Sequence, residues 1–265
     1  MTLVVRPRSS VRLDRHDPRA TPGFTGGKDE GLKELSRQVE HLERLQELLF
    51  ADGRHRLLVV LQGMDTSGKD GVIRHVFDGM NPQGVTVANF RQPTPIEAAH
   101  DFLWRIHAHV PMKGQVAIFN RSHYEDVLVV RVHGAITGAQ CARRLKNIVA
   151  FEEMLANEGV TIVKFFLHIS KGEQKRRFLD RVRDPQKRWK FNLGDLSERK
   201  HWAKYMRAYE DALGATSTAQ APWYIIPADH KWYRNLAIAR IILQAMTRMD
   251  LRYPRTPKPA DIKIR

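Results

Sequence analysis

The chain has 265 residues, 42% of them hydrophobic, which is enough to bury the core of one globular domain with extensions at its ends. It carries 44 Lys and Arg against 29 Asp and Glu, and this net charge of +15 favours a polyanionic partner: nucleic acid, an anionic membrane or another chain of phosphates. No apolar run reaches the roughly 18 residues that span a bilayer, and no signal-peptide segment is present, so a cytoplasmic protein is expected. The single cysteine, Cys141, excludes an intrachain disulfide.

The order of apolar segments predicts an α/β domain. Residues 1–30 carry Pro and Gly without periodicity and are expected to form an extended arm, and an amphipathic helix is expected over 31–50. Further along, short apolar runs typical of buried strands alternate with helical patterns. Strands are expected at 57–61, 85–90, 116–119, 160–169 and 224–226, and helices at 71–80, 96–109, 139–158, 173–182, 198–213 and 232–249. This alternation predicts a parallel sheet covered on both faces, with ligands at the carboxyl ends of its strands, in a domain over 31–250 that precedes an irregular tail, 251–265.

A glycine-rich loop that fits the pattern G-x-x-x-x-G-K follows the first predicted strand directly. Glycines let successive backbone N–H groups point inward, the next helix adds partial positive charge at its N-terminus, and the lysine reaches terminal phosphates. Because strand, spacing, lysine and helix agree, the loop is interpreted as a phosphate site rather than as a turn without a ligand. The residues expected to bind phosphate are Gly63, Thr66, Ser67, Gly68, Lys69 and Asp70.

Acidic residues in and after this loop indicate a metal ion. Most such loops place Ser or Thr after the lysine to bind magnesium, but Asp70 stands there in this chain, and Asp65 lies inside the loop. Carboxylates beside phosphates imply a cation between them. We therefore expect Mg²⁺, with Mn²⁺ as an alternative, held by Asp65 and a second carboxylate.

The third predicted strand runs into a polar segment, residues 120–126, that can supply the second carboxylate. The position that is usually acidic at the end of such a strand is Asn120, so the metal role is assigned to Glu125 or Asp126. Arg121 is expected to face the transferred phosphoryl group. The alternative interpretation of this segment is a solvated polar loop.

Residues 171–207 form a strongly basic segment with 13 Lys and Arg against five Asp and Glu. Such a run is usually a solvated helical face, but the Asp184-Pro185 step interrupts the helix, and further cations follow in an irregular stretch. A broken, cation-rich helical hairpin is similar to the lid of a nucleotide kinase. Closure of such a lid excludes water and supplies positive charge to phosphoryl transfer.

Together, the loop at 63–71, the segment at 119–126 and the lid residues 183–190 resemble the second family of polyphosphate kinases. The likeness extends over about residues 27–253. It implies a thymidylate-kinase-like P-loop fold, magnesium dependence, inorganic polyphosphate as phosphoryl donor or product, and homo-oligomers, either dimers or tetramers. It also implies phosphate contacts from Lys69 and the loop amides and a place for Asp65 at the magnesium. Further phosphoryl contacts are implied for Arg121, Arg131, Arg177, Lys187 and Lys190.

One departure within the family indicates the acceptor. Many members carry Asp at the position of Asn120 and Asn-Arg at the positions of Glu125 and Asp126. The pattern in this chain is similar to the third class of the family, which is associated with both AMP and ADP as acceptors. The purine pocket is expected after the second strand, near Asn89, Phe90 and Arg91.

The sequence thus predicts direct in-line phosphoryl transfer from polyphosphate to AMP or ADP, giving ADP and ATP, with no nucleic-acid or membrane partner. No covalent intermediate is expected, because the nearest nucleophile candidate, His123, has no orienting partner in sequence. One alternative is a nucleoside monophosphate kinase that uses ATP as donor, which does not explain the cationic excess. Another is a nucleic-acid-binding protein with a vestigial loop, although the main cation cluster lies in the lid and no nucleic-acid motif is present.

Overall fold

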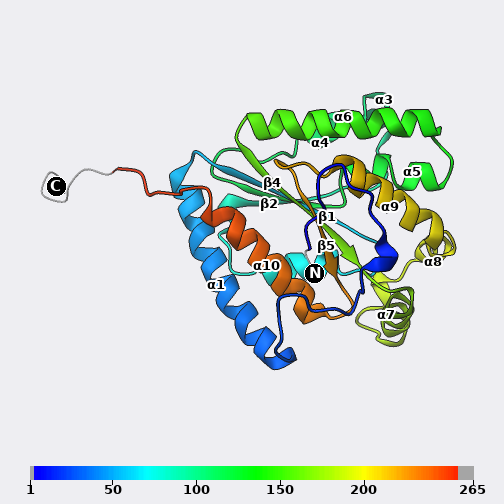
Figure 1. The fold of residues 1–265 in the computed structure, drawn as a ribbon, viewed down its shortest axis with the longest axis horizontal. Helices are drawn as coiled ribbons and strands as arrows, with labels where there is room; N and C mark the ends of the chain where they lie inside the picture. The colour runs from blue at the N-terminus through cyan, green and yellow to red at the C-terminus, as the bar shows by residue number, and fades with distance from the viewer. Residues whose placement is uncertain (1–2, 256–265) are drawn as a thin grey trace, which may run out of the picture.

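Five parallel strands form the centre of residues 3–255, the part of the chain that the computed structural model describes (Figure 1). The strands are β1 (Arg56–Gln62), β2 (Val85–Asn89), β3 (Val116–Asn120), β4 (Val160–His168) and β5 (Trp223–Pro227), in the spatial order β2-β3-β1-β4-β5. β1 lies in the middle, and its residues from Leu57 to Leu61 are fully buried, as a strand covered on both faces requires. The predicted parallel sheet is confirmed.

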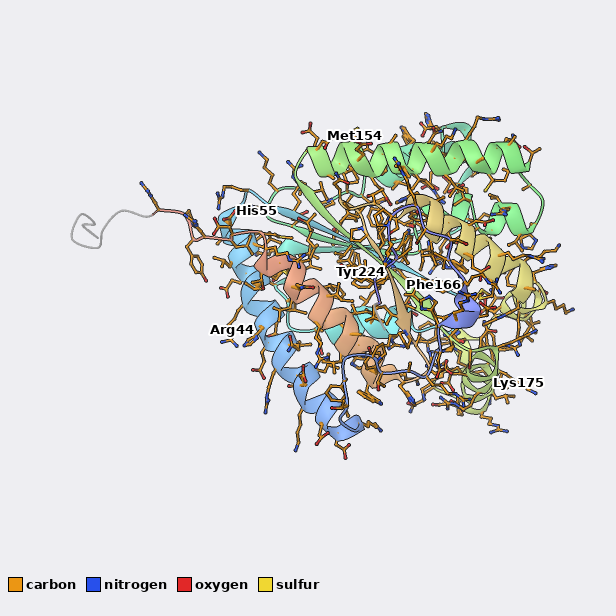
Figure 2. All side chains as sticks on the ribbon, viewed as in Figure 1. Arg44, His55, Met154, Phe166, Lys175 and Tyr224 are labelled. Carbon is orange, nitrogen blue, oxygen red and sulfur yellow. The ribbon has the colours of Figure 1, made fainter. Side chains whose placement is uncertain are left out.

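Helices cover both faces of the sheet. On one side α1 (Lys28–Asp52) packs along α10 (Lys231–Thr247), which also contacts α2 (Lys69–Val76), and on the other side α6 (Gly138–Asn157) packs against α9 (Trp202–Thr216) (Figure 1). The shorter elements are α3 (Pro95–Ala99), α4 (Trp104–His107), α5 (Val129–Val132), α7 (Lys171–Arg183), α8 (Leu193–Lys200) and the 3-10 turns η1 (Leu13–Arg15), η2 (Pro82–Gly84), η3 (His123–Asp126) and η4 (Arg188–Lys190). Figure 2 shows Phe166 and Tyr224 near the sheet, whereas Arg44 and Lys175 extend outward from α1 and α7. No helix within residues 3–255 is both long and apolar enough to cross a membrane.

Two predicted helices are divided in the structure. The helix expected over 96–109 is wrong, because α3 ends before His100, whose backbone is extended, and the Asp101 side chain accepts from the N–H of Leu103 at 2.9 Å to start α4. The helix expected over 198–213 is likewise split at His201 into α8 and α9. Both breaks follow from local turn geometry that an apolar period does not report.

The N-terminal segment before α1 covers the edge of the sheet. Val4 bridges Tyr224 in antiparallel fashion, and the N–H of Val5 donates to the carbonyl of Trp223 at 2.8 Å. This pairing protects the open edge of β5 from association with another chain. The predicted arm, 1–30, overlaps the first turn of α1, and its residues 1–2, like 256–265 of the predicted tail, lie outside the described residues.

Candidate active site

The loop from Gly63 to Gly68 joins β1 to α2 in a backbone conformation that only particular residues tolerate. Gly63 and Gly68 have φ angles of 149° and 104°, which L-residues rarely adopt. A Cβ at Gly63 would lie 2.8 Å from the carbonyl oxygen of Leu167, so the loop also packs too tightly there for a side chain. Thr66 holds a left-handed φ of 64°. Such strain is typical of sites that a fold keeps for function.

Lys69 lies across this loop rather than in solvent. Lys69 is only 9% exposed, and its Nζ donates to the carbonyl oxygen of Gly63 at 2.7 Å. Burial, and then the charge of Arg121, lower the pKa of Lys69. The Oγ1 of Thr66 and Oγ of Ser67 are buried and have no hydrogen-bond partner among the described residues. Because buried hydroxyls are normally paired, these two atoms indicate a ligand that offers oxygen or a cation.

Arg121 connects the second motif to the loop. It follows β3 directly, has a left-handed φ of 62°, and its N–H donates to the carbonyl of Leu61 at 3.1 Å. Its Nη2 donates to Oδ1 of Asp65 at 2.8 Å, and its Nη1 lies 4.0 Å from Oε2 of Glu125. Although burial opposes the charge, the carboxylates of Glu125 and Asp65 raise the pKa of Arg121. The structure therefore brings the predicted residues Asp65, Lys69, Arg121 and Glu125 together.

Asp126 is directed elsewhere. Its carboxylate lies 3.7 Å from Arg105 and 3.8 Å from Arg144, and none of its ion pairs involves the loop. Glu125, by contrast, responds to Lys69 and Arg121: burial raises the pKa of its carboxyl, and these two cations oppose the shift. Successive residues of a 3-10 turn such as η3 point in directions about 120° apart. The expectation that the Asp126 carboxylate lies beside Asp65 is thus wrong, whereas Glu125 lies by Arg121 at the loop, and its metal role stays a prediction.

Asn120 links two other predicted residues. Its Nδ2 donates to Oδ1 of Asp70 and to Oδ1 of Asn89, each at 2.8 Å. Asp70 is exposed at the start of α2, and Asn89 ends β2. The amide thus joins the carboxyl ends of β2 and β3 to the first turn of the helix that follows the loop.

The carboxylates at the carboxyl ends of β1 and β3 are too few to hold a divalent cation alone, but they suit one that also binds substrate phosphates. No group of three or more His, Cys, Asp or Glu side chains converges to hold a metal within residues 3–255. Asp65 and Glu125 flank Arg121, beside the unpaired hydroxyls of Thr66 and Ser67. Mg²⁺ usually binds one or two carboxylates, several waters and substrate phosphates, so this donor set fits that ion.

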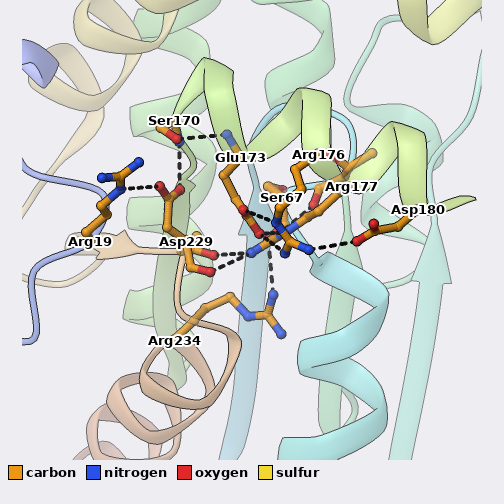
Figure 3. Close-up of polar contacts among 11 residues, drawn as sticks. Arg19, Ser67, Ser170, Glu173, Arg176, Arg177, Asp180, Asp229 and Arg234 are labelled. Atoms are coloured by element: carbon orange, nitrogen blue, oxygen red, sulfur yellow. Dashed lines mark hydrogen bonds and ion pairs between the residues drawn. The ribbon is translucent and has the colours of Figure 1, made fainter. Parts of the chain in front are cut away.

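Arg177 does not face the open site (Figure 3). It is 6% exposed, and all five of its N–H donors are used by the protein. The acceptors are Oε1 of Glu173 and the carbonyl oxygens of Thr66, Ser67, Ala228 and Asp229, at 2.6–3.0 Å. With no donor left for a phosphoryl group, the predicted phosphate contact of Arg177 is wrong. This side chain instead fixes α7 beneath the loop.

The remaining predicted cations lie at the surface. Lys187 is exposed and pairs with Asp184, and Nζ of Lys190, which is also exposed, lies 4.9 Å from the ring centre of Trp189. Arg131, on α5, pairs with Asp211 of α9 at 2.6 Å. It lines a surface cavity of about 400 Å³ with Lys204 and Arg207, and it pairs with α9 rather than with the phosphate loop. The phosphate contacts of Lys187, Lys190 and Arg131 stay predictions.

The segment expected to bind the purine is partly core. Phe90 is 5% exposed and packs edge-on against Phe119, with ring centres 4.9 Å apart. Asn89 and Arg91 are exposed, and the Arg91 carbonyl accepts from Nη1 of Arg105 at 2.8 Å. The ring of Phe90 therefore supports the end of β2, and the base contact of this segment stays a prediction.

Two residues near the site escaped the sequence analysis. Asp195, in the first turn of α8, has a carboxyl whose pKa is raised to about 6 by burial and by the negative charge of Asp65. Arg234 of α10 is 2% exposed and donates to the carbonyl of Ser67 at 3.2 Å. In the sequence, Asp195 is a single acid within the basic segment 171–207, and Arg234 is a single cation within an apolar helix. Neither pattern indicates that the residue lies near the site.

A buried polar network supports the second motif from below. Lys164 of β4 donates to Glu152 of α6 and, at 2.9 Å, to the hydroxyl of Tyr124. Tyr124 in turn donates to Glu152 at 2.8 Å, and Nε2 of His123 lies 3.2 Å from the same carboxylate. Because these groups are nearly fully buried and contact one another through the Glu152 carboxylate, η3 is anchored to the sheet at the turn that carries Glu125.

Known proteins resemble this chain over almost its whole length. A family model described as polyphosphate kinase 2 matches residues 26–254. An AMP/ADP-polyphosphate phosphotransferase of Meiothermus ruber is 52% identical over 260 residues, which cover 98% of this chain and 97% of the relative. An ADP-polyphosphate phosphotransferase of Rhodopseudomonas palustris is 43% identical over 251 residues, 90% of this chain and 87% of the relative. The crystal structure of polyphosphate kinase 2 from Arthrobacter aurescens TC1 aligns with a TM-score of 0.94 and 46% identity, over 99% of this chain and 92% of that one.

Proposed function

This chain belongs to the polyphosphate kinase 2 family, and on that premise we propose that it transfers a phosphoryl group between inorganic polyphosphate and AMP or ADP, giving ADP and ATP. The fold is accordingly that of a P-loop kinase. The observation that carries the proposal is the convergence of Lys69, Asp65, Arg121 and Glu125 at the carboxyl ends of β1 and β3. The name of the Meiothermus ruber relative supports both acceptors.

Each residue of this cluster has a role in the proposed reaction. The loop N–H groups and Lys69 hold phosphate oxygens, and Arg121 supplies positive charge where the transferred phosphoryl group passes. Asp65 and Glu125 would hold Mg²⁺, which when bound neutralises charge on the phosphates. Asp65 also orients Arg121 through their 2.8 Å ion pair. Transfer is direct and in line, since catalysis of this kind rests on positioning and charge neutralisation rather than on a protein nucleophile.

We propose that residues 171–207 act as a lid over this cluster. Nε2 of Gln174 on α7 donates to the carbonyl of Asp65 at 3.0 Å, and Oε1 of Gln174 accepts from Arg199 of α8 at 2.6 Å. These bonds tie both lid helices to the phosphate loop. The exposed cations Lys187 and Lys190 lie in the segment between these two helices, where they can contact a long polyanion. A homo-oligomer, either a dimer or a tetramer, and a cytoplasmic location stay predictions.

A donor assay tests the proposed function. The full chain is given AMP or ADP, Mg²⁺ and either polyphosphate or ATP as sole donor, and products are separated by chromatography. We expect polyphosphate to convert AMP to ADP and ADP to ATP. Transfer to AMP from ATP but not from polyphosphate would indicate the alternative nucleoside monophosphate kinase, and no transfer from either donor would contradict both.

A further inference from the structure

Two buried guanidinium groups lie directly behind the phosphate loop (Figure 3). Arg177 reaches the loop from α7 and Arg234 reaches it from α10, and both donate to the carbonyl oxygen of Ser67, at 3.0 and 3.2 Å. A Cβ at Gly68 would lie 1.9 Å from Nη1 of Arg234, and one at Gly71 would lie 3.0 Å from Nη2. Arg234 therefore packs on the back of the loop and on the first turn of α2.

The two arginines differ in how their charges are balanced. Arg177 forms an ion pair with Glu173 at 2.7 Å. Arg234 has only neutral partners: Oδ1 of Asn235, at 2.8 and 3.1 Å, and the carbonyl of Ser67. Within residues 3–255 it forms no ion pair. Burial, and then the neighbouring charge of Arg177, lower the pKa of Arg234 to about 9, so the group is still a cation at pH 7.

A buried cation without a counter-charge is costly for a folded protein. The anion site next to Arg234 is the loop itself, because Arg234 bonds to the Ser67 carbonyl and packs on Gly68. In this low-dielectric region a charge acts on a bound anion more strongly than an exposed lysine does. The hydrogen bond to the Ser67 carbonyl also polarises the Ser67–Gly68 peptide, which makes the N–H of Gly68 a stronger donor.

We propose that Arg234 is a positioning residue for the phosphate loop, and that its buried charge is balanced by the phosphoryl group that the loop binds. It raises the affinity for phosphate without touching the substrate, because it acts through the Ser67–Gly68 peptide and across the loop. This inference rests on the proposed function, since it takes the loop to be the phosphate site.

The test compares phosphate binding with stability in full-length variants. Arg234→Met removes the charge at similar volume, and Arg234→Lys keeps a charge without the planar fork. Arg240→Met is the matched control, because Arg240 lies on the same helix but pairs with Glu34. Binding of inorganic tripolyphosphate is measured by calorimetry, thermal unfolding is followed with and without it, and KM for polyphosphate and kcat are measured.

We expect Arg234→Met to bind tripolyphosphate at least about tenfold more weakly, with KM rising more than kcat falls. Arg234→Lys should recover most of the affinity, and Arg240→Met should bind like the wild type. Without ligand, Arg234→Met should unfold at no lower Tm than the wild type, because it no longer buries an unpaired charge, and its Tm should rise less on adding tripolyphosphate. Should this variant fail to fold, Arg234→Gln provides the same comparison.

Equal tripolyphosphate affinity in the wild type and the uncharged Arg234 variant would overturn the inference, as would a lower ligand-free Tm with unchanged affinity, which a purely structural role predicts. A wild type that neither binds tripolyphosphate nor makes ATP from polyphosphate would instead contradict the proposed function. The two failures are therefore distinguishable.

Discussion

Asp70 and Asn120 both depart from the residue types usual at their two positions. A P-loop commonly has a hydroxyl after its lysine and an acid at the end of the facing strand. Here the acid stands after Lys69 and the amide ends β3, and the two are joined by a hydrogen bond of 2.8 Å. The contact between strand and helix is thus retained, while the negative charge moves from the sheet to the start of α2.

Lys69 gives the most direct test of the site at the residue scale. The residue is only 9% exposed and is bonded to Gly63, so a methionine, which fills a similar volume, is a better replacement than an alanine. Lys69→Met should lower kcat for polyphosphate-dependent ATP synthesis by about 10² or more, because an ammonium that neutralises phosphate charge is removed. Unfolding in urea checks that the fold is kept. A near-normal kcat in a folded variant would remove Lys69 from the mechanism.

Glu125 is expected to influence the choice of acceptor. AMP has a single phosphate and is expected to place its phosphorus deeper toward the donor than ADP does, so a cation or water held by Glu125 would support the shorter acceptor. We expect Glu125→Asn to reduce kcat/KM for AMP more than for ADP, by about tenfold in the ratio, if one charge-assisted contact is lost. Both values are measured at fixed polyphosphate and Mg²⁺.

Asp126→Asn is the matched control for that comparison, because its carboxylate faces Arg105 and Arg144 rather than the loop. It should leave the ratio of the two acceptors unchanged. A proportional loss for AMP and ADP in Glu125→Asn would show that this carboxylate serves a step common to both.

At the scale of elements, the sequence predicts motifs whose residues follow one another along the chain. It does not predict which face of a helix packs against the rest of the protein. Strand, glycines, lysine and helix follow one another from Leu57 to Val76, so local rules place the whole phosphate loop. Arg176 and Arg177 are neighbours as well, yet Arg176 is exposed and pairs with Glu173 and Asp180, whereas Arg177 lies buried beneath the loop. A charge pattern cannot tell which face of α7 packs until the end of β5 and the loop are placed in space.

The packing of the N-terminal segment on β4 predicts a pH dependence of stability. His168 ends β4, its Nε2 donates to the carbonyl of His16 at 3.0 Å, and burial lowers its pKa from 6.5 to about 4. The contribution of the buried, neutral His168 to the free energy of unfolding is fully present above pH 6.5, where this side chain is neutral in both the folded and the unfolded chain. As the pH falls from 6.5 to 4, only the unfolded chain takes up the proton, so the free energy of unfolding decreases by up to about 3 kcal/mol.

His168→Gln should remove this part of the acid sensitivity. Urea unfolding at pH 7, 5.5 and 4 measures it, and the exposed His230→Gln serves as control. The stability of the His168 variant relative to the wild type should improve as the pH falls. Parallel curves for the wild type and both variants would contradict a buried, neutral His168.

On the scale of the whole molecule, the cations behind the net charge of +15 differ in burial and in what they contact. Arg177 and Arg234 are buried and bond to the loop backbone, Arg121 pairs with Asp65 of the loop, and Lys187 and Lys190 are exposed in the proposed lid. Total charge attracts any polyanion from a distance, but only cations that contact phosphates release counterions on binding. The composition therefore predicts a polyanionic partner, and the arrangement of the cations predicts where that partner lies.

Variants in the proposed lid and in helix α1 distinguish attraction by total charge from direct contacts to phosphates. Lys187→Ala/Lys190→Ala and Lys33→Ala/Arg44→Ala each remove two positive charges from exposed positions, the first pair from the lid and the second from α1. For long-chain polyphosphate, log(kcat/KM) should fall with log salt about two units less steeply in the lid variant, because each lost contact lowers the slope by about one. The α1 variant should keep the slope of the wild type, and the slope for ADP should be unchanged in both. If the two variants lower the polyphosphate slope equally, then net charge alone attracts the substrate and the lid lysines are only a solvated surface.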